Sequence, residues 1–281
     1  MKKHLLTLSI LISAVAVAQP VRLHLMGGFA NYTGDIQQKR FTLGQAKLVV
    51  SAGGTFNITD KIALRGDISY GHVGADDKKN TNAAVAARNL NFTSKIQEVD
   101  LMVEYDILSL YDHRLSPYVF AGVGIFHFSP YTFDSLGKAF LSSYSTEGQG
   151  LPEYPDRQPY KRTQLNIPFG GGVKYALSDD IHLGVEVGIR KLFTDYLDDV
   201  SKTYVDQDVL LNRRGPRAVE LAFRGDEVKG STRTYPKAGT GRGGVSKDFY
   251  YFGQFRISFR MNWFDNSTRG NRSRIDCPTN L

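Results

Sequence analysis

Apolar and polar residues alternate along a stretch near the end of the chain, from Phe249 to Trp263. Its odd positions are mostly apolar, whereas Gln254, Arg256, Ser258 and Arg260 occupy even positions. A period of two predicts a β-strand, because successive side chains of a strand point to opposite faces. A long strand with one apolar, aromatic-flanked face and one charged face is typical of a membrane β-barrel.

Seven earlier segments repeat this alternation. They are residues 22–32, 47–57, 62–70, 96–107, 117–128, 165–175 and 181–190. Eight strands can close with no free edge. We therefore predict an all-β fold, an eight-stranded antiparallel transmembrane β-barrel with long extracellular loops. Segment 117–128 is ambiguous because aromatic and aliphatic residues occupy both of its faces, and there we assign Val119, Ala121, Val123 and Ile125 to lipid.

Short and long connections alternate between the predicted strands. The last two long ones run from about 129 to 164 and from about 192 to 246. Short turns of such barrels face the periplasm and long loops face outward, so we expect both termini in the periplasm. Within the loops, Gly215 to Phe223 predicts a short helix with Pro216 at its first position, and residues 82–89 predict a weaker one.

The N-terminus predicts export. Lys2 and Lys3 precede an apolar run, which ends in the small-residue pattern of Ala16 to Ala18. This is the form of a secretory signal peptide, and the run is too short for the alternative, a membrane-spanning anchor. We predict a signal peptide at 1–18, an outer-membrane barrel at 19–264 and a periplasmic C-terminal tail at 265–281, in the outer membrane of a Gram-negative bacterium.

Composition narrows the possible functions. The chain has 281 residues, 12% of them aromatic, and one Cys, which excludes a disulfide scaffold. The net charge of +7 falls to +5 without Lys2 and Lys3, which does not imply nucleic acid. Because basic residues cluster in the last long loop and the tail, we expect lipid headgroups of the outer membrane or an acidic protein as partners.

Charged residues on the inward faces nearly balance. They are Arg22, Arg65, Asp67, Glu98, Asp100, Glu104, Lys174, Glu186, Arg190, Arg256 and Arg260. An eight-stranded barrel is only just wide enough for its own side chains, so the charges must pair to offset the cost of desolvation. We predict an ion-pair core, and the alternative is a proton or ion pathway.

Catalytic and metal motifs are not evident. Asp198 with Asp199, or Asp206 with Asp208, could suggest calcium or general acid and base groups, but acids in loops more often cap turns or remain solvated. Residues 239–244 match GxGxxG without the flanking strand and helix that give the motif meaning, so we interpret them as a flexible loop. Cys277 has no paired Cys. We expect no enzymatic activity, cofactor, metal or small-molecule substrate.

The last long loop and the tail are candidate contact regions. Apolar residues in the loop predict packing over the barrel mouth or against a partner, with nearby carboxylates holding the fold. The loop residues are Asp195, Tyr196, Leu197, Asp198, Asp199 and Val200, with Tyr204 and Val205. For the tail we predict docking on a partner through Arg269, Arg272, Arg274, Ile275 and Pro278, the alternative being a disordered, solvated segment.

Several motifs together resemble a known family. They are NYTGD at 31–35, RNLNF at 88–92, PYVFAGVG at 117–124, FSP at 128–130, IPFGGGVKY at 167–175, FTDYLDDVS at 193–201 and KDFYYF at 247–252. They are similar to the PorG-like outer-membrane barrels of Bacteroidetes-type bacteria. The resemblance implies an eight-stranded barrel that anchors the type IX secretion machinery on a periplasmic ring of PorK and PorN type. The alternative is a self-standing small barrel, either a narrow pore, an adhesin or a surface-binding protein.

Overall fold

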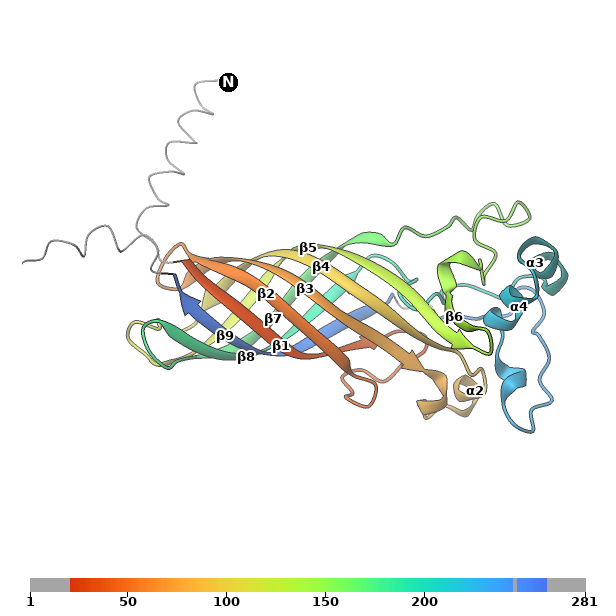
Figure 1. Ribbon diagram of the computed structural model, residues 1–281, viewed down its shortest axis with the longest axis horizontal. Helices are drawn as coiled ribbons and strands as arrows, with labels where there is room; N and C mark the ends of the chain where they lie inside the picture. Colours follow the sequence, from red (N-terminus) through yellow and green to blue (C-terminus); the bar gives the residue numbers. More distant parts are fainter. Residues whose placement is uncertain (1–20, 245–246, 262–281) are drawn as a thin grey trace, which may run out of the picture.

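The computed structural model describes residues 21–244 and 247–261, and they form a closed antiparallel barrel (Figure 1). Its strands are β1 (Val21–Thr33), β2 (Lys47–Asn57), β3 (Ile62–Asp76), β4 (Asn91–Asp106), β5 (Leu115–Asp134), β7 (Thr163–Ala176), β8 (Ile181–Leu192) and β9 (Phe249–Arg260). Neighbours follow the order β4-β3-β2-β1-β9-β8-β7-β5, and pairing of β4 with β5 closes the ring. The predicted eight-stranded fold is confirmed.

The alternation of side chains separates an apolar outside from a filled interior. On β5, the outward assignment is confirmed, since Val119, Val123 and Ile125 are 50%, 62% and 54% exposed. The inward Phe126 and Phe128 of the same strand are completely buried. Segment 117–128 is apolar on both faces because part of the lumen is itself a hydrophobic core.

Three strands extend further than predicted. β3 continues to Asp76, β4 begins at Asn91, and β5 continues to Asp134. The sequence prediction stopped where polar residues interrupt the apolar alternation, at His72 on β3, Lys95 on β4 and Ser129 on β5. Strand pairing continues past these residues, so the barrel projects beyond its main apolar band.

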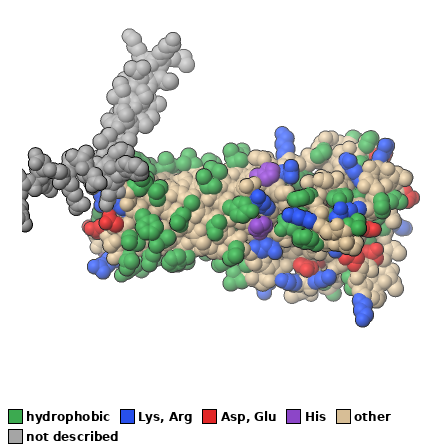
Figure 2. Space-filling model, in the orientation of Figure 1, with side chains coloured by type: hydrophobic (Ala, Val, Ile, Leu, Met, Phe, Trp, Pro, Cys, Tyr) green, Lys and Arg blue, Asp and Glu red, His purple; other side chains and the backbone are tan. Residues whose placement is uncertain are grey.

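The two ends of the barrel differ. The short turns at 58–61, 107–114 and 177–180 lie at the end where β1 begins and β9 finishes, which we call the short-turn end (Figure 1). The opposite, long-loop end carries the remaining connections. Figure 2 shows hydrophobic side chains spread over the barrel beside the short-turn end, and charged side chains gathered toward the long-loop end.

The long loops fold into a cap. Its elements are β6 (Gly137–Phe140), which pairs with β5, the helices α2 (Ala83–Ala86), α3 (Gln207–Arg214) and α4 (Pro216–Ala222), and the 3₁₀ turns η1 (Asp77–Lys79), η2 (Leu141–Ser143) and η3 (Gly225–Glu227). The prediction of a helix with Pro216 at its start is confirmed. Neither β6 nor α3 was predicted. None of the described helices is long and apolar enough to cross a membrane.

The flexible-loop interpretation of residues 239–244 is wrong. Arg242 is buried, Thr203 forms a β-bridge with Gly241, and the Gly244 amide donates to Asp35 Oδ1 at 2.6 Å. The glycines let this segment lie against Ser201 and Asp35, where side chains would collide. The predicted signal peptide at 1–18, the tail at 265–281 and Trp263 lie outside the described residues.

Candidate functional site

An ion-pair layer crosses the lumen at Arg65 of β3. Its guanidinium donates to both carboxylate oxygens of Glu186 on β8, at 2.7 and 2.8 Å, and lies 2.7 Å from Asp67 and 3.2 Å from Glu104. Arg65 has no exposed surface. Three buried carboxylates therefore surround one buried guanidinium in the middle of the lumen.

A second layer lies toward the short-turn end, around Glu104 of β4. Glu104 accepts from Arg256 of β9 at 2.8 Å and from Lys174 of β7 at 2.5 Å. Lys174 also donates to Asp106 at 2.7 Å. Three strands separate β4 from β9 in either direction around the ring, so the Arg256 contact spans the full width of the barrel.

A third group lies on the long-loop side of Arg65. Arg190 of β8 donates to Glu98 of β4 at 3.0 Å and lies 3.9 Å from Asp100. Glu98 also accepts from Asn166 at 2.9 Å and from the Tyr250 hydroxyl. Both carboxyl oxygens of Asp100 are buried without a hydrogen-bond partner.

His24 lies between two of these charged groups. Its Nδ1 is 3.3 Å from Arg256 Nη2 and 3.4 Å from the Thr55 hydroxyl, and its Nε2 is 2.7 Å from Asp67 Oδ1. The buried lumen thus holds Arg65, Lys174, Arg190 and Arg256 against Asp67, Glu98, Asp100, Glu104 and Glu186. The five carboxyls outnumber the four cations by one, and Asp100 is the carboxyl that accepts no hydrogen bond.

Aromatic residues fill the lumen on the long-loop side of these charges. The completely buried rings of Phe126 and Phe128 stack at 5.6 Å between centroids, and Tyr250 meets Phe126 edge-on at 5.7 Å. Leu197 and Val200 of the last long loop belong to the same buried cluster. The barrel is therefore filled by ion pairs at one level and by an apolar plug at the next.

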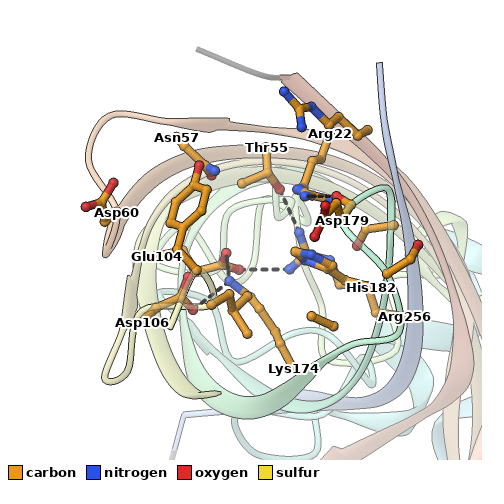
Figure 3. Close-up of a pocket in the computed structure, with 16 residues that line it drawn as sticks. Arg22, Thr55, Asn57, Asp60, Glu104, Asp106, Lys174, Asp179, His182 and Arg256 are labelled. Atoms are coloured by element: carbon orange, nitrogen blue, oxygen red, sulfur yellow. Dashed lines mark hydrogen bonds and ion pairs between the residues drawn. The ribbon is translucent and has the colours of Figure 1, made fainter. Parts of the chain in front are cut away.

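A cavity of about 230 Å³ opens at the short-turn end (Figure 3). Glu104, Lys174 and Arg256 form its inner limit, and Figure 3 shows their side chains directed toward one another. Arg22 lies at the rim, where it donates to the Asp179 carbonyl at 2.6 Å, and Arg260 also lines the cavity. Arg22 and Arg260 are half-buried and lie outside the ion-pair core in which the sequence analysis grouped them.

Hydrogen bonds tie the 195–200 loop motif to the barrel mouth. The Tyr32 hydroxyl of β1 contacts Asp198 at 2.5 Å and Asp248 at 3.1 Å. Asp248 in turn accepts from the Leu197 amide at 2.9 Å, and Asp198 from the Val200 amide at 2.9 Å. Carboxylates at the two ends of the last long loop therefore meet on one tyrosine.

The remaining loop acids have separate partners. Asp199 accepts from the Tyr160 hydroxyl at 2.7 Å and from Thr146, and Asp195 accepts from Ser201 at 2.8 Å. Tyr196 stacks on Tyr160 with centroids 4.8 Å apart. Burial raises the pKa of both Asp195 and Asp199 to about 6. Among the described residues, no group of three or more His, Cys, Asp or Glu side chains is arranged to hold a metal ion.

Sequence reasoning missed the centre of the cap. Glu147 accepts from the amides of Ser201 and Lys202, both at 3.0 Å, and lies 3.3 Å from Arg242. Arg242 also donates to the Asp199 carbonyl at 2.7 Å. Glu147 and Arg242 are far apart in the chain and match no local motif, so only their burial reveals the pair. The predicted tail residues, Arg269, Arg272, Arg274, Ile275 and Pro278, lie outside the described residues.

The family model for the domain of unknown function DUF6089 matches residues 2–211. The chain belongs to this family. The match includes all barrel strands except β9. A search of curated proteins finds no match.

Solved structures give a second comparison. Neisserial surface protein A is 11% identical with a TM-score of 0.42, covering 86% of this chain and 97% of its own. Ail from Yersinia pestis is 8% identical, with a TM-score of 0.41 and coverage of 86% and 99%. OprG from Pseudomonas aeruginosa is 12% identical, with a TM-score of 0.41 and coverage of 86% and 98%.

Proposed function

We propose that this DUF6089 protein is a sealed outer-membrane anchor for a periplasmic protein assembly, rather than a channel. The observation that carries the proposal is the filled lumen, in which Arg65 and Glu186 join opposite walls at 2.7 Å. A barrel without a free path acts through its surfaces and ends. The short-turn end, with its cavity, the start of β1 and the end of β9, then faces the periplasm.

The assembly we propose is the type IX secretion machinery, with a periplasmic ring of PorK and PorN type as the partner. Support comes from the motifs shared with PorG-like barrels, among them FTDYLDDVS at 193–201. In this chain, that motif anchors the cap through Asp198 and Tyr32 rather than forming a reactive site. The basic tail at 265–281 offers charge for an acidic surface on the ring.

Affinity purification in mild detergent tests this role. Truncation after Phe264, and separately Arg269→Gln/Arg272→Gln/Arg274→Gln, should leave the barrel heat-modifiable on gels but release the periplasmic proteins. The matched control, Lys229→Gln/Arg233→Gln/Lys237→Gln, removes three charges from the exposed long-loop end. This control should still co-purify with the periplasmic proteins. Truncated protein that still co-purified with the ring and supported wild-type secretion would refute docking through the tail.

A surface-binding role is the second candidate, because the cap has a hydrophobic core of its own. Leu151, Val205 and Leu210 are buried together there. A loop that only avoided the membrane would not require such packing. If deletion of α3 and α4 abolished adhesion or ligand binding by whole cells while secretion continued, this second role would replace the first.

A further inference from the structure

The outer surface of the barrel changes from apolar to polar within two residues on three adjacent strands. Ile68, Val99 and Ile125 align across β3, β4 and β5, and all three are exposed. The next two outward rows toward the long-loop end hold Tyr70, Gln97 and His127, and then His72, Lys95 and Ser129. Since the outward apolar side chains mark the hydrocarbon, these rows lie at the level of lipid headgroups.

Cationic side chains converge at this boundary. Lys95 of β4 pairs with His72 of β3. Lys138 Nζ lies over the ring of Tyr131, which pairs with Thr93, two residues along β4 from Lys95. Lys47 of β2 lies beside Gly74 of β3, with its Cε 2.8 Å from where a Cβ on that glycine would lie. We call Lys47, His72, Lys95 and Lys138 the boundary cluster. Figure 2 shows basic and His side chains gathered between the hydrophobic band and the loops.

Two lysines of the boundary cluster, Lys95 and Lys138, lie over aromatic rings. Lys95 Nζ lies 4.9 Å from the Tyr70 ring centroid, and Lys138 Nζ lies 3.7 Å from that of Tyr131 and 4.8 Å from that of Phe140. A ring face attracts an ammonium group without cancelling its charge. The ion pairs of the described residues lie elsewhere, in the lumen, the short-turn cavity and the cap. The cluster therefore presents net positive charge beside an aromatic girdle.

We propose that the boundary cluster binds the phosphate groups of a phosphorylated glycolipid in the outer leaflet. Its acyl chains would lie against the row of Ile68, Val99 and Ile125, and its sugars beside Tyr70, Tyr131 and the amide of Gln97. The lysines come from three elements, β2, β4 and β6, and adjacent strands lie about 4.8 Å apart. The cluster is thus wider than one phosphate, and it suits two phosphates carried on a disaccharide.

This inference rests on the orientation in the proposed function, with the long-loop end outside. Its test does not depend on the secretion role, because it uses the full purified protein in mild detergent without periplasmic partners. The probes are bisphosphorylated lipid A, the same lipid without phosphates, and phosphatidylglycerol. Binding is measured by native mass spectrometry. We expect lipid A to bind roughly tenfold or more tightly than either other lipid, because two phosphates engage the cluster.

The variant Lys47→Gln/Lys95→Gln/Lys138→Gln should weaken lipid A binding by roughly 100-fold, since each Lys near an anionic surface contributes about a factor of five. The control, Lys61→Gln/Lys229→Gln/Lys237→Gln, removes the same charge from exposed positions elsewhere and should bind normally. Equal binding of lipid A with and without phosphates, or of phosphatidylglycerol and lipid A, would overturn the proposal. So would unchanged binding by a heat-modifiable triple variant. If that variant fails to fold, the binding of the three lipids to the unmodified protein still tests the proposal.

Discussion

Arg65 on β3 and Glu186 on β8 form a two-point ion pair between opposite walls of the barrel, at 2.7 and 2.8 Å. Three strands lie between them in either direction around the ring. The Tyr118 hydroxyl donates to the same Glu186 carboxylate at 2.5 Å. Removing the charge of Glu186 would leave the buried Arg65 guanidinium with one charged partner fewer.

We therefore expect Glu186→Gln to lower the free energy of unfolding by about 3–5 kcal/mol, the usual cost of breaking one side of a buried ion pair. The measurement is the midpoint of urea unfolding in detergent, followed by heat-modifiable gel migration. The matched control is Glu220→Gln, at an exposed position of α4, which should change stability little. Equal midpoints for the two variants would show that Glu186 is hydrated rather than fixed by Arg65.

The filled lumen also predicts a low conductance. The ion-pair layers around Arg65 and Glu104, and the aromatic plug of Phe126 and Phe128, leave a solute no straight path. In planar bilayers the purified protein should give no large, stable single-channel steps. Large, stable conductance steps from the unmodified protein would indicate a pore and would contradict the proposed role as a sealed anchor.

Tyr32→Phe tests how the cap is attached. The substitution removes the only hydroxyl of that side chain, which contacts both Asp198 and Asp248. Loss of a donor to buried carboxyl groups costs about 1–3 kcal/mol. We expect faster protease cleavage between residues 195 and 208 while the barrel stays heat-modifiable. Tyr111→Phe, at a residue that is 70% exposed, is the control and should leave cleavage unchanged.

The buried acids of the cap predict a pH dependence. Burial raises the pKa of Asp199 to about 6 in the folded protein, above the value of about 3.9 for an unfolded chain. The folded cap therefore binds the proton more tightly, and this contribution to stability is complete below pH 4 and is lost as the pH rises through 6. The difference for Asp199 is on the order of 3 kcal/mol, and the half-buried Asp195 adds less.

Protease resistance of the cap should accordingly be greater at pH 5 than at pH 7.5, with cleavage of the unfolded protein at each pH as the reference. Asp199→Asn cannot ionise, and Asn tolerates the positive φ of 67° at this position, so the variant should lose much of the difference. Asp226→Asn, at an exposed position, should keep it. Identical pH profiles for the Asp199 variant and the unmodified protein would assign the effect to other groups.

Local patterning was enough to identify the strands, their faces and the order of short and long connections. Alternation along β5 assigned Val119, Val123 and Ile125 to the outside, because lipid selects apolar side chains at every second position. The same alternation assigned Arg65, Glu104 and Glu186 to the inward face. It could not give the ends of β3, β4 and β5, because strand pairing persists past the residues at which polar side chains interrupt the apolar alternation.

The sequence by itself determined the barrel and the charge of its interior, since both follow from a period of two and from the small diameter of eight strands. Only the tertiary structure decided which charges pair. Closure of the ring sets Arg65 opposite Glu186, and folding of the long loops brings Glu147 to Arg242 and Tyr32 to Asp198. These partners are distant along the chain, so their distances depend on closure and packing rather than on any local pattern.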